Sequence, residues 1–371
     1  MTDSPARLFS TRGSERFLAD HWQREPLFLR AALPALPPTP QWRALAASDE
    51  VESRRIVTLA DGRLRLSDGP ITSADPAQPW TVLIQDADFH APALRALFHA
   101  IDFLPTWRTE DIMMSVASAG GSVGPHVDAY DVFLVQARGT RRWQIGRAGE
   151  YESAPHDGGL RLVKSFDAAL SVVAAPGDVL YLPPDVPHYG VAENDCITYS
   201  IGFRAPTLHE LSAVALEKLS SEPRYTDAGA ERATDPARID APTIARLRQQ
   251  LGAFLALDDA TLAAALGEVM TEMKPWLAPD DARADDAAVT LPCGSPHLAT
   301  WPGMRLARYD DDAGGMLFAN GQSYPLEEPG QVAIADNLSR HGHATCPDQP
   351  ACRVLAQSLL DDGIVRIAHD N

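Results

Sequence analysis

Two residues that can bind a metal, His126 and Asp128, lie one position apart at the head of the apolar segment 124–146. On a β-strand, residues i and i+2 point to the same face, so both side chains can reach one point in space. A metal pair of this kind needs a third ligand from another strand. His188 qualifies, because it follows a strand and a tight Pro-rich turn that would hold its ring rigidly.

Two histidines and one carboxylate leave three coordination positions open, an arrangement that suits non-haem Fe(II) and O2 chemistry. A structural zinc site would close all four of its positions. We therefore predict that His126, Asp128 and His188 bind a catalytic metal.

A second group of metal-binding residue types follows near the C-terminus: His341, His343, Cys346 and Cys352. The H-x-H spacing, with five residues between the cysteines, fits no common zinc pattern. We interpret this segment as a polar loop.

The segments around the predicted ligands read as short strands separated by turn residues. From about residue 51 to 203, apolar runs alternate with Gly and Pro, and a hairpin with an Asp-Gly turn opens the series. Many short strands of this kind favour a barrel or sandwich. A short amphipathic helix is expected within 14–31, ending at Pro26 before a strand, and another helix over 91–103.

After residue 205 the pattern becomes helical, with apolar residues at three- and four-residue spacing and a polar loop near 221–237. An acidic, Ala-rich linker is expected at 278–286, followed by a small mixed unit of strands and helix. The predicted domains are therefore 1–205, 206–277 and 278–371.

Composition restricts the partners. The net charge of −18 would repel nucleic-acid phosphates and attract a basic partner. Four cysteines without a paired framework, and no secretory signal, indicate a reducing cytoplasm. No apolar run approaches the roughly 20 residues that a membrane span needs.

The motif spacings resemble those of the cupins. They are Gly120-x5-His126-x-Asp128 and Gly177-x5-Pro183-x4-His188. The Glu of the first cupin motif is absent, and Ala192 replaces the Asn expected after the last His. These departures favour the JmjC-type 2-oxoglutarate oxygenases, and the stretches around 130–146 and 199–206 resemble the bacterial ribosomal oxygenases. The resemblance implies an α+β fold: a double-stranded β-helix followed by a helical dimerisation domain and a C-terminal winged-helix-like unit.

The same resemblance implies cofactors and further site residues. Family members use Fe(II), O2 and 2-oxoglutarate, and bind the distal carboxylate of 2-oxoglutarate with a basic residue on the strand after the HxD motif. Arg141 matches that position, and its planar fork suits a carboxylate. Strand parity places Trp143 on the same face and Arg142 on the other. Ser200, or alternatively Tyr199 or Thr198, would add a hydroxyl to the carboxylate.

The resemblance implies that the substrate is a basic ribosomal protein, large-subunit ribosomal protein sixteen. The hydroxylated atom would be the β-carbon of one of its arginines. Tyr130 and Asp131, beside the metal pair, are candidate contacts for the guanidinium. The resemblance also implies a homodimer, for which the apolar stripe of 207–277 is a candidate surface. We expect no direct DNA binding. The alternatives are a histidyl hydroxylase of another ribosomal protein, a lysyl demethylase, or a non-catalytic scaffold or regulator.

Overall fold

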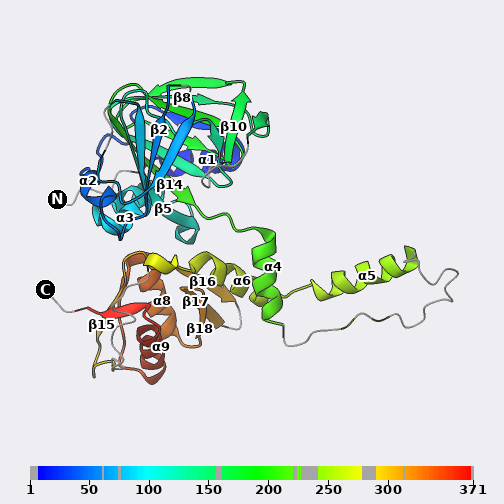
Figure 1. Cartoon of the computed structure of the whole chain (residues 1–371). Coiled ribbons are helices and arrows are strands. Elements are labelled where there is room, and N and C mark those ends of the chain that lie inside the picture. The colour runs from blue at the N-terminus through cyan, green and yellow to red at the C-terminus, as the bar shows by residue number, and fades with distance from the viewer. Residues whose placement is uncertain are drawn as a thin grey trace. The chain divides into compact units, whose positions relative to one another are not determined.

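The computed structural model describes residues 7–60, 62–73, 77–154, 161–219, 224, 226, 241–277, 290–311 and 314–368. The chain divides into two compact units, residues 1–205 and 206–371 (Figure 1). No helix in the described part of the chain is long and apolar enough to cross a membrane.

The first unit is rich in strands and carries its helices mainly in its N-terminal half. Its helical segments are α1 (Thr11–Asp20), α2 (Trp42–Ala46), α3 (Ala87–His90) and the 3-10 segments η1 (Pro92–Ile101) and η2 (Thr106–Arg108). Its strands are β1 (Leu27–Leu29), β2 (Ser53–Thr58), β3 (Leu64–Asp68), β4 (Trp80–Ile84), β5 (Thr109–Ala117), β6 (His126–Val127), β7 (Val132–Arg138), β8 (Arg141–Ile145), β9 (Tyr151–Ser153), β10 (Arg161–Phe166), β11 (Leu170–Ala174), β12 (Val179–Leu182), β13 (His188–Ala192) and β14 (Cys196–Phe203).

These strands form two antiparallel sheets. The larger sheet has the order β1-β12-β7-β14-β5-β4-β2-β3, and the smaller has the order β11-β8-β13-β6-β10-β9. Strands that follow one another in the chain are repeatedly assigned to different sheets, as β12, β13 and β14 are. This is the topology of a double-stranded β-helix, so the predicted cupin-type barrel is confirmed.

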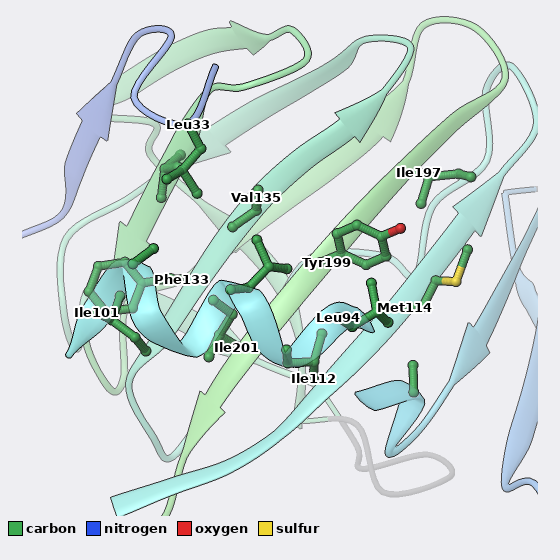
Figure 2. Packing of buried hydrophobic residues seen from close by; sticks show 14 of the residues in the cluster. Leu33, Leu94, Ile101, Ile112, Met114, Phe133, Val135, Ile197, Tyr199 and Ile201 are labelled. Carbon is green, nitrogen blue, oxygen red and sulfur yellow. The ribbon is translucent and has the colours of Figure 1, made fainter. Parts of the chain in front are cut away.

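The larger sheet separates two environments, because its side chains alternate between faces. On β7, Phe133 and Val135 belong to the large hydrophobic core, whereas Leu134 belongs to a separate cluster with Trp143 of the smaller sheet. Tyr199 lies on the core face of β14, and Figure 2 shows it beside the helical segment that covers this face. The opposite face of the larger sheet therefore lines the barrel interior.

Helix α1 closes the core through one aromatic side chain. The side chain of Ser10 caps the helix by accepting from the Gly13 N–H. Phe17 is fully buried, with its ring 4.8 Å from that of Tyr181 on β12. The helix ends at Asp20, so Trp22 lies beyond it and stacks on Tyr181. The helix expected over 91–103 is instead a 3-10 segment that begins at Pro92.

The second unit contains helices and two small sheets. Its elements are α4 (Leu208–Glu217), α5 (Ala241–Phe254), α6 (Asp259–Thr271), η3 (Pro275–Leu277), β15 (His297–Thr300), β16 (Leu306–Asp311), β17 (Gly314–Ala319), β18 (Gln322–Leu326), α8 (Pro329–His341), β19 (His343–Thr345), α9 (Pro350–Asp361) and β20 (Val365–Ile367). The sheets have the orders β19-β15-β20 and β16-β17-β18. Helix α8 was not expected from the sequence.

Helix α6 packs on the sheet of β16, β17 and β18. The contact is close, because a Cβ at Gly267 would lie 2.2 Å from the ring of Phe318. The two predicted domains on either side of residue 277 therefore touch through α6. The three-domain division and the winged-helix assignment stay predictions. The acidic linker 278–286 lies outside the described residues, as does the loop 221–237 apart from residues 224 and 226.

Candidate active site

The three predicted metal ligands meet on the inner face of the smaller sheet. His126 on β6 and His188 on β13 are cross-strand partners, with ring centroids 4.2 Å apart. Asp128 follows β6, and its Oδ2 lies 3.6 Å from Nε2 of His188. Among the described residues, these are the only three His, Cys, Asp or Glu side chains whose ligand atoms cluster, all within 4.8 Å of one another.

Both imidazole rings are held by the backbone. Nδ1 of His126 lies 3.0 Å from the carbonyl oxygen of Gly124, and Nδ1 of His188 lies 3.0 Å from that of Val186. A carbonyl oxygen only accepts, so each Nδ1 carries the proton and donates. Each Nε2 is then left with a free lone pair, which is the form of histidine that binds metals.

Burial keeps His188 neutral. Loss of water around the ring and the neighbouring His126 lower the pKa of His188 to about 4, although Asp128 acts in the opposite direction. A neutral imidazole competes for a metal without first losing a proton. Two imidazole nitrogens and one carboxylate oxygen form the 2-His-1-carboxylate set, whose open positions suit non-haem iron. The donor set therefore fits the predicted metal.

Arg141 is a buried guanidinium without an anionic partner among the described residues. Its side chain is 3% exposed, and its NH2 group donates to Ser115 Oγ at 3.2 Å and lies 3.6 Å from Cys196 Sγ. In the described part of the chain, its Nε has no hydrogen-bond partner. Burying an unpaired charge is costly, so a site like this is suited to an anionic ligand. A carboxylate is the geometric match for the guanidinium fork.

The strand parity predicted for β8 agrees with the structure. Arg141 and Trp143 are buried, with the guanidinium carbon 5.6 Å from the Trp143 ring centroid. Arg142 is exposed on the other face and forms an ion pair with Glu193. Ala192, the residue that replaces the expected cupin Asn, lies opposite Arg141 in the sheet, where its small side chain leaves room for the guanidinium.

The three candidate hydroxyl residues of β14 lie on different faces of the strand. Ser200 is buried on the interior face, opposite Met113 and Leu134. Thr198 lies on the same face, but its hydroxyl donates to Gln136 at 3.0 Å. Tyr199 points into the hydrophobic core, so the alternative that it contacts the cosubstrate is wrong.

The hydroxyl that contacts Arg141 belongs to a residue that the sequence analysis missed. Ser115 lies on β5, which pairs with β14 so that Ser115 faces Thr198. Alternation along β5 predicts a buried residue at this position. Only the pairing of β5 with β14 in the larger sheet brings it to Arg141.

Asp131 does not lie where a substrate contact would. It is fully buried, its Oδ1 accepts from the Tyr181 hydroxyl at 2.6 Å, and its Oδ2 accepts from Gln23 Nε2 at 2.9 Å. Arg108 lies 3.6 Å from the same carboxylate. Both oxygens are occupied, so we correct the prediction: Asp131 holds the core together and is not available to a guanidinium.

Tyr130 is placed differently. It is 43% exposed. The charge of Asp128 and partial burial raise the pKa of its hydroxyl, and the charges of Asp111 and Glu110 add to this effect. A neutral aromatic ring beside the Asp128 carboxylate suits a cation such as a guanidinium. Glu110 is itself paired with Arg204, and Asp111 accepts from the Asp86 N–H. The pair Glu110-Asp111 was not singled out from the sequence, although two adjacent acids at the head of a strand are a readable signal.

The second set of metal-binding residue types does not form a site in the described part of the chain. Cys346 and Cys352 are buried in the hydrophobic core of the second unit. His343 is exposed on β19, a strand where the sequence had suggested a loop.

A double-stranded β-helix with two histidines and a carboxylate on its inner face is the architecture of a JmjC domain. Residues 96–211 match the family model described as the JmjC domain. The match includes all three predicted ligands and Arg141.

The chain is similar to ribosomal oxygenases over nearly its whole length. It is 30% identical over 364 residues to the ribosomal protein uL16 3-hydroxylase of Escherichia coli, covering 94% of this chain and 95% of that protein. It is 38% identical over 211 residues to a probable ribosomal oxygenase of Haemophilus influenzae, an alignment that spans 53% of this chain and 51% of that protein. The chain therefore belongs to the ribosomal oxygenase family of JmjC-domain proteins.

Solved structures show the same likeness. The structure of Escherichia coli ribosomal oxygenase YcfD in complex with cobalt and 2-oxoglutarate has a TM-score of 0.76 and 26% sequence identity, and the match covers 97% of this chain and 99% of that chain. A YcfD structure with cobalt and succinic acid has a TM-score of 0.75 and 28% identity, with coverage of 97% and 99%.

Proposed function

We propose that this protein is an Fe(II)- and 2-oxoglutarate-dependent dioxygenase that hydroxylates the β-carbon of an arginine in ribosomal protein uL16. One observation carries the proposal. The ligand atoms of His126, Asp128 and His188 gather within 4.8 Å of one another in a barrel that also buries Arg141, which has no anionic partner among the described residues. A relative whose name gives it the uL16 3-hydroxylase activity aligns with 94% of the chain.

Iron and 2-oxoglutarate, when bound, supply the oxidation of a carbon–hydrogen bond by O2, with conversion of 2-oxoglutarate to succinate and CO2. The chain's own residues bind, orient and shield. His126 and His188 present Nε2 to the metal, and Asp128 adds one oxygen. Arg141 and Ser115 bind the distal carboxylate of 2-oxoglutarate. Ser200, on the interior face of β14, adds a hydroxyl to the same carboxylate. The similar YcfD structure is in complex with cobalt and 2-oxoglutarate, which supports a metal and this cosubstrate for the present chain.

The substrate assignment rests on charge and on the relative. A net charge of −18 favours encounter with a basic ribosomal protein. Beside the predicted metal ligands, Tyr130 offers an exposed ring near the carboxylate of Asp128. This combination suits the guanidinium of an arginine whose β-carbon then lies near the metal.

Histidyl hydroxylation and demethylation have weaker support. The relatives described as bifunctional lysine-specific demethylase and histidyl-hydroxylase, from Drosophila persimilis and Drosophila pseudoobscura pseudoobscura, align over only 71 residues, 19% of this chain. The scaffold alternative would leave the clustered metal ligands and Arg141 without a role.

A homodimer and a cytoplasmic location complete the proposal. Helix α5 has no buried residue, and three of its apolar side chains repeat at helical spacing and are exposed: Ile244, Leu247 and Leu251. Leu255, just after the helix, is exposed as well. A second copy of this helix would cover such a stripe. A ribosomal substrate supports a cytoplasmic location, and the acidic charge disfavours direct contact with DNA.

The experiment measures succinate formed from 2-oxoglutarate by the Fe(II)-loaded protein, with and without a uL16 fragment. We expect uL16 to increase succinate formation by at least about tenfold, and His126→Ala to abolish it. Succinate formation that is independent of uL16 would redirect the search to another substrate. No succinate under any condition would contradict the enzyme assignment.

A further inference from the structure

The two segments that carry the metal ligands are joined by Asp185, three residues before His188. The N–H of Asp185 donates to the carbonyl oxygen of Asp128 at 2.9 Å. This hydrogen bond connects the backbone of one metal ligand to the turn that precedes another. The relative position of Asp128 and His188 therefore depends on where Asp185 lies.

The backbone of Asp185 has an unusual conformation. Its φ is +63°, in the left-handed region that few residues other than glycine adopt, although Asp is among those that tolerate it. The turn around it is stiff, because Pro183, Pro184 and Pro187 flank it. A left-handed residue at this point directs its N–H toward the Asp128 segment.

The side chain of Asp185 is fixed from the other direction. The hydroxyl of Tyr151, on β9, donates to Asp185 Oδ1 at 2.6 Å. The N–H of Gly149 donates to the carbonyl oxygen of Asp185 at 3.2 Å. Asp185 thus holds three elements together: the Asp128 segment, the 149–151 segment and the turn before His188.

The turn also orients the His188 ring. The carbonyl oxygen of Val186, the next residue after Asp185, accepts from Nδ1 of His188 at 3.0 Å. A rotation of the backbone at Asp185 would displace this carbonyl and the hydrogen bond to Asp128 together. Two of the three metal ligands therefore respond to one residue that is not itself a ligand.

We propose that Asp185 is a positioning residue of the metal site, held by Tyr151, and that it sets the geometry between Asp128 and His188. The inference rests on the proposed metal site. Residues that orient metal ligands from outside the coordination sphere typically change metal affinity by about 10- to 100-fold when removed. We therefore expect the loss of the Asp185 carboxylate to weaken metal affinity.

The test is calorimetric titration of the metal-free full chain with Co²⁺. The variants are Asp185→Gly, which keeps the left-handed backbone but removes the carboxylate, Asp185→Asn, which keeps an acceptor for Tyr151, and Tyr151→Phe. We expect the Kd for Co²⁺ to rise about tenfold in Asp185→Gly and to rise measurably in Tyr151→Phe, with Asp185→Asn near the wild type.

A matched control separates positioning from stability. Tyr324→Phe removes an equivalent hydrogen bond to Asp362, 2.8 Å long, in the second unit. It should change the melting temperature of the metal-free protein as much as Tyr151→Phe does, and leave the Kd for Co²⁺ unchanged.

Three other results would overturn the inference about Asp185, and one of them would also overturn the proposed function. Wild-type Kd values in both Asp185→Gly and Tyr151→Phe, with Co²⁺ bound normally by the unsubstituted protein, would overturn the inference and leave the proposed function intact. Failure of the unsubstituted protein to bind Co²⁺ would overturn the proposed function, and the inference with it. A loss of affinity that only follows a loss of stability equal to that of Tyr324→Phe would also overturn the inference.

Discussion

His126 and His188 lie directly opposite each other on β6 and β13, and each ring is fixed through Nδ1 by a carbonyl oxygen two residues earlier in the chain. Cross-strand pairing sets the distance between the rings, and the backbone hydrogen bonds set their rotation. Both Nε2 atoms are therefore arranged for a metal by the sheet itself, and binding requires little ordering of side chains.

The first prediction concerns the metal. Co²⁺ in 100-fold excess over its Kd should stabilise the first unit by about 2.7 kcal/mol, or about 5 to 10 °C in melting temperature. His126→Ala should lose this shift, because only two ligands remain. Differential scanning calorimetry with and without Co²⁺ measures it. An equal shift in His126→Ala would show that the metal binds elsewhere.

The second prediction concerns the buried guanidinium. Arg141→Met should raise the Kd for 2-oxoglutarate by about 10- to 150-fold, the equivalent of about 1.5 to 3 kcal/mol for lost hydrogen bonds to a charged group. Co²⁺ affinity should not change. Arg142→Met is the control, because Arg142 is adjacent in sequence but faces the solvent. Competitive binding measurements on the Co²⁺-loaded protein give the Kd for 2-oxoglutarate in both variants. Equal Kd values in Arg141→Met and Arg142→Met would contradict the role of Arg141.

Much of this site was readable from the sequence. Period-two alternation on β8 places Arg141 and Trp143 on one face, and the structure agrees, because a strand buried on only one face tolerates no other register. The motif spacing of His126, Asp128 and His188 predicted that these side chains meet, and the structure brings their ligand atoms within 4.8 Å of one another. These features depend on residues that are close in sequence or on motifs with fixed spacing.

Other features were not readable because they depend on how strands pair over long range. Ser115 contacts Arg141 only because β5 and β8 face each other across the barrel. Asp131 was wrongly predicted to contact the substrate because its neighbours in sequence lie at the predicted metal site. Its actual partners, Gln23 and Tyr181, are 108 and 50 residues away. Proximity in sequence to a metal ligand does not fix the direction of a side chain.

The third prediction tests the correction at Asp131. Asp131→Ala should lower the free energy of unfolding by about 2 to 4 kcal/mol, because the Tyr181 hydroxyl and the Gln23 amide lose their buried acceptor. Asp20→Ala, which removes an exposed ion pair with Arg16, should change it by less than about 1 kcal/mol. Urea denaturation gives both values. A near-normal stability with a raised KM for uL16 would instead restore the substrate contact.

The fourth prediction uses a glycine that the site requires. A Cβ at Gly190 would lie 2.5 Å from the Trp143 ring, which is itself 6.0 Å from the His188 ring between centroids. Gly190→Ala should therefore cost about 1 to 3 kcal/mol of stability from overpacking and should weaken Co²⁺ binding. Gly252→Ala on helix α5, where a Cβ meets nothing within 4 Å, should be neutral or slightly stabilising. Thermal melts and Co²⁺ titration of both variants test this, and a stable Gly190→Ala protein with normal Co²⁺ affinity would contradict the packing argument.

The fifth prediction concerns the exposed aromatic ring beside the metal ligands. Tyr130→Ala should raise the KM for uL16 by about tenfold, because one cation–π or stacking contact with the guanidinium contributes about 0.5 to 2 kcal/mol. The Kd values for Co²⁺ and 2-oxoglutarate should stay unchanged. Steady-state kinetics with varied uL16 measure the effect. An unchanged KM would place the substrate on another surface.

The central claim is tested most directly by mass spectrometry of a uL16 fragment incubated with the protein, Fe(II), 2-oxoglutarate and ascorbate, with His126→Ala as the control. The account predicts the addition of one oxygen atom, mapped by fragmentation to a single arginine and absent with the variant. An unmodified arginine, or oxygen added equally by His126→Ala, would contradict it.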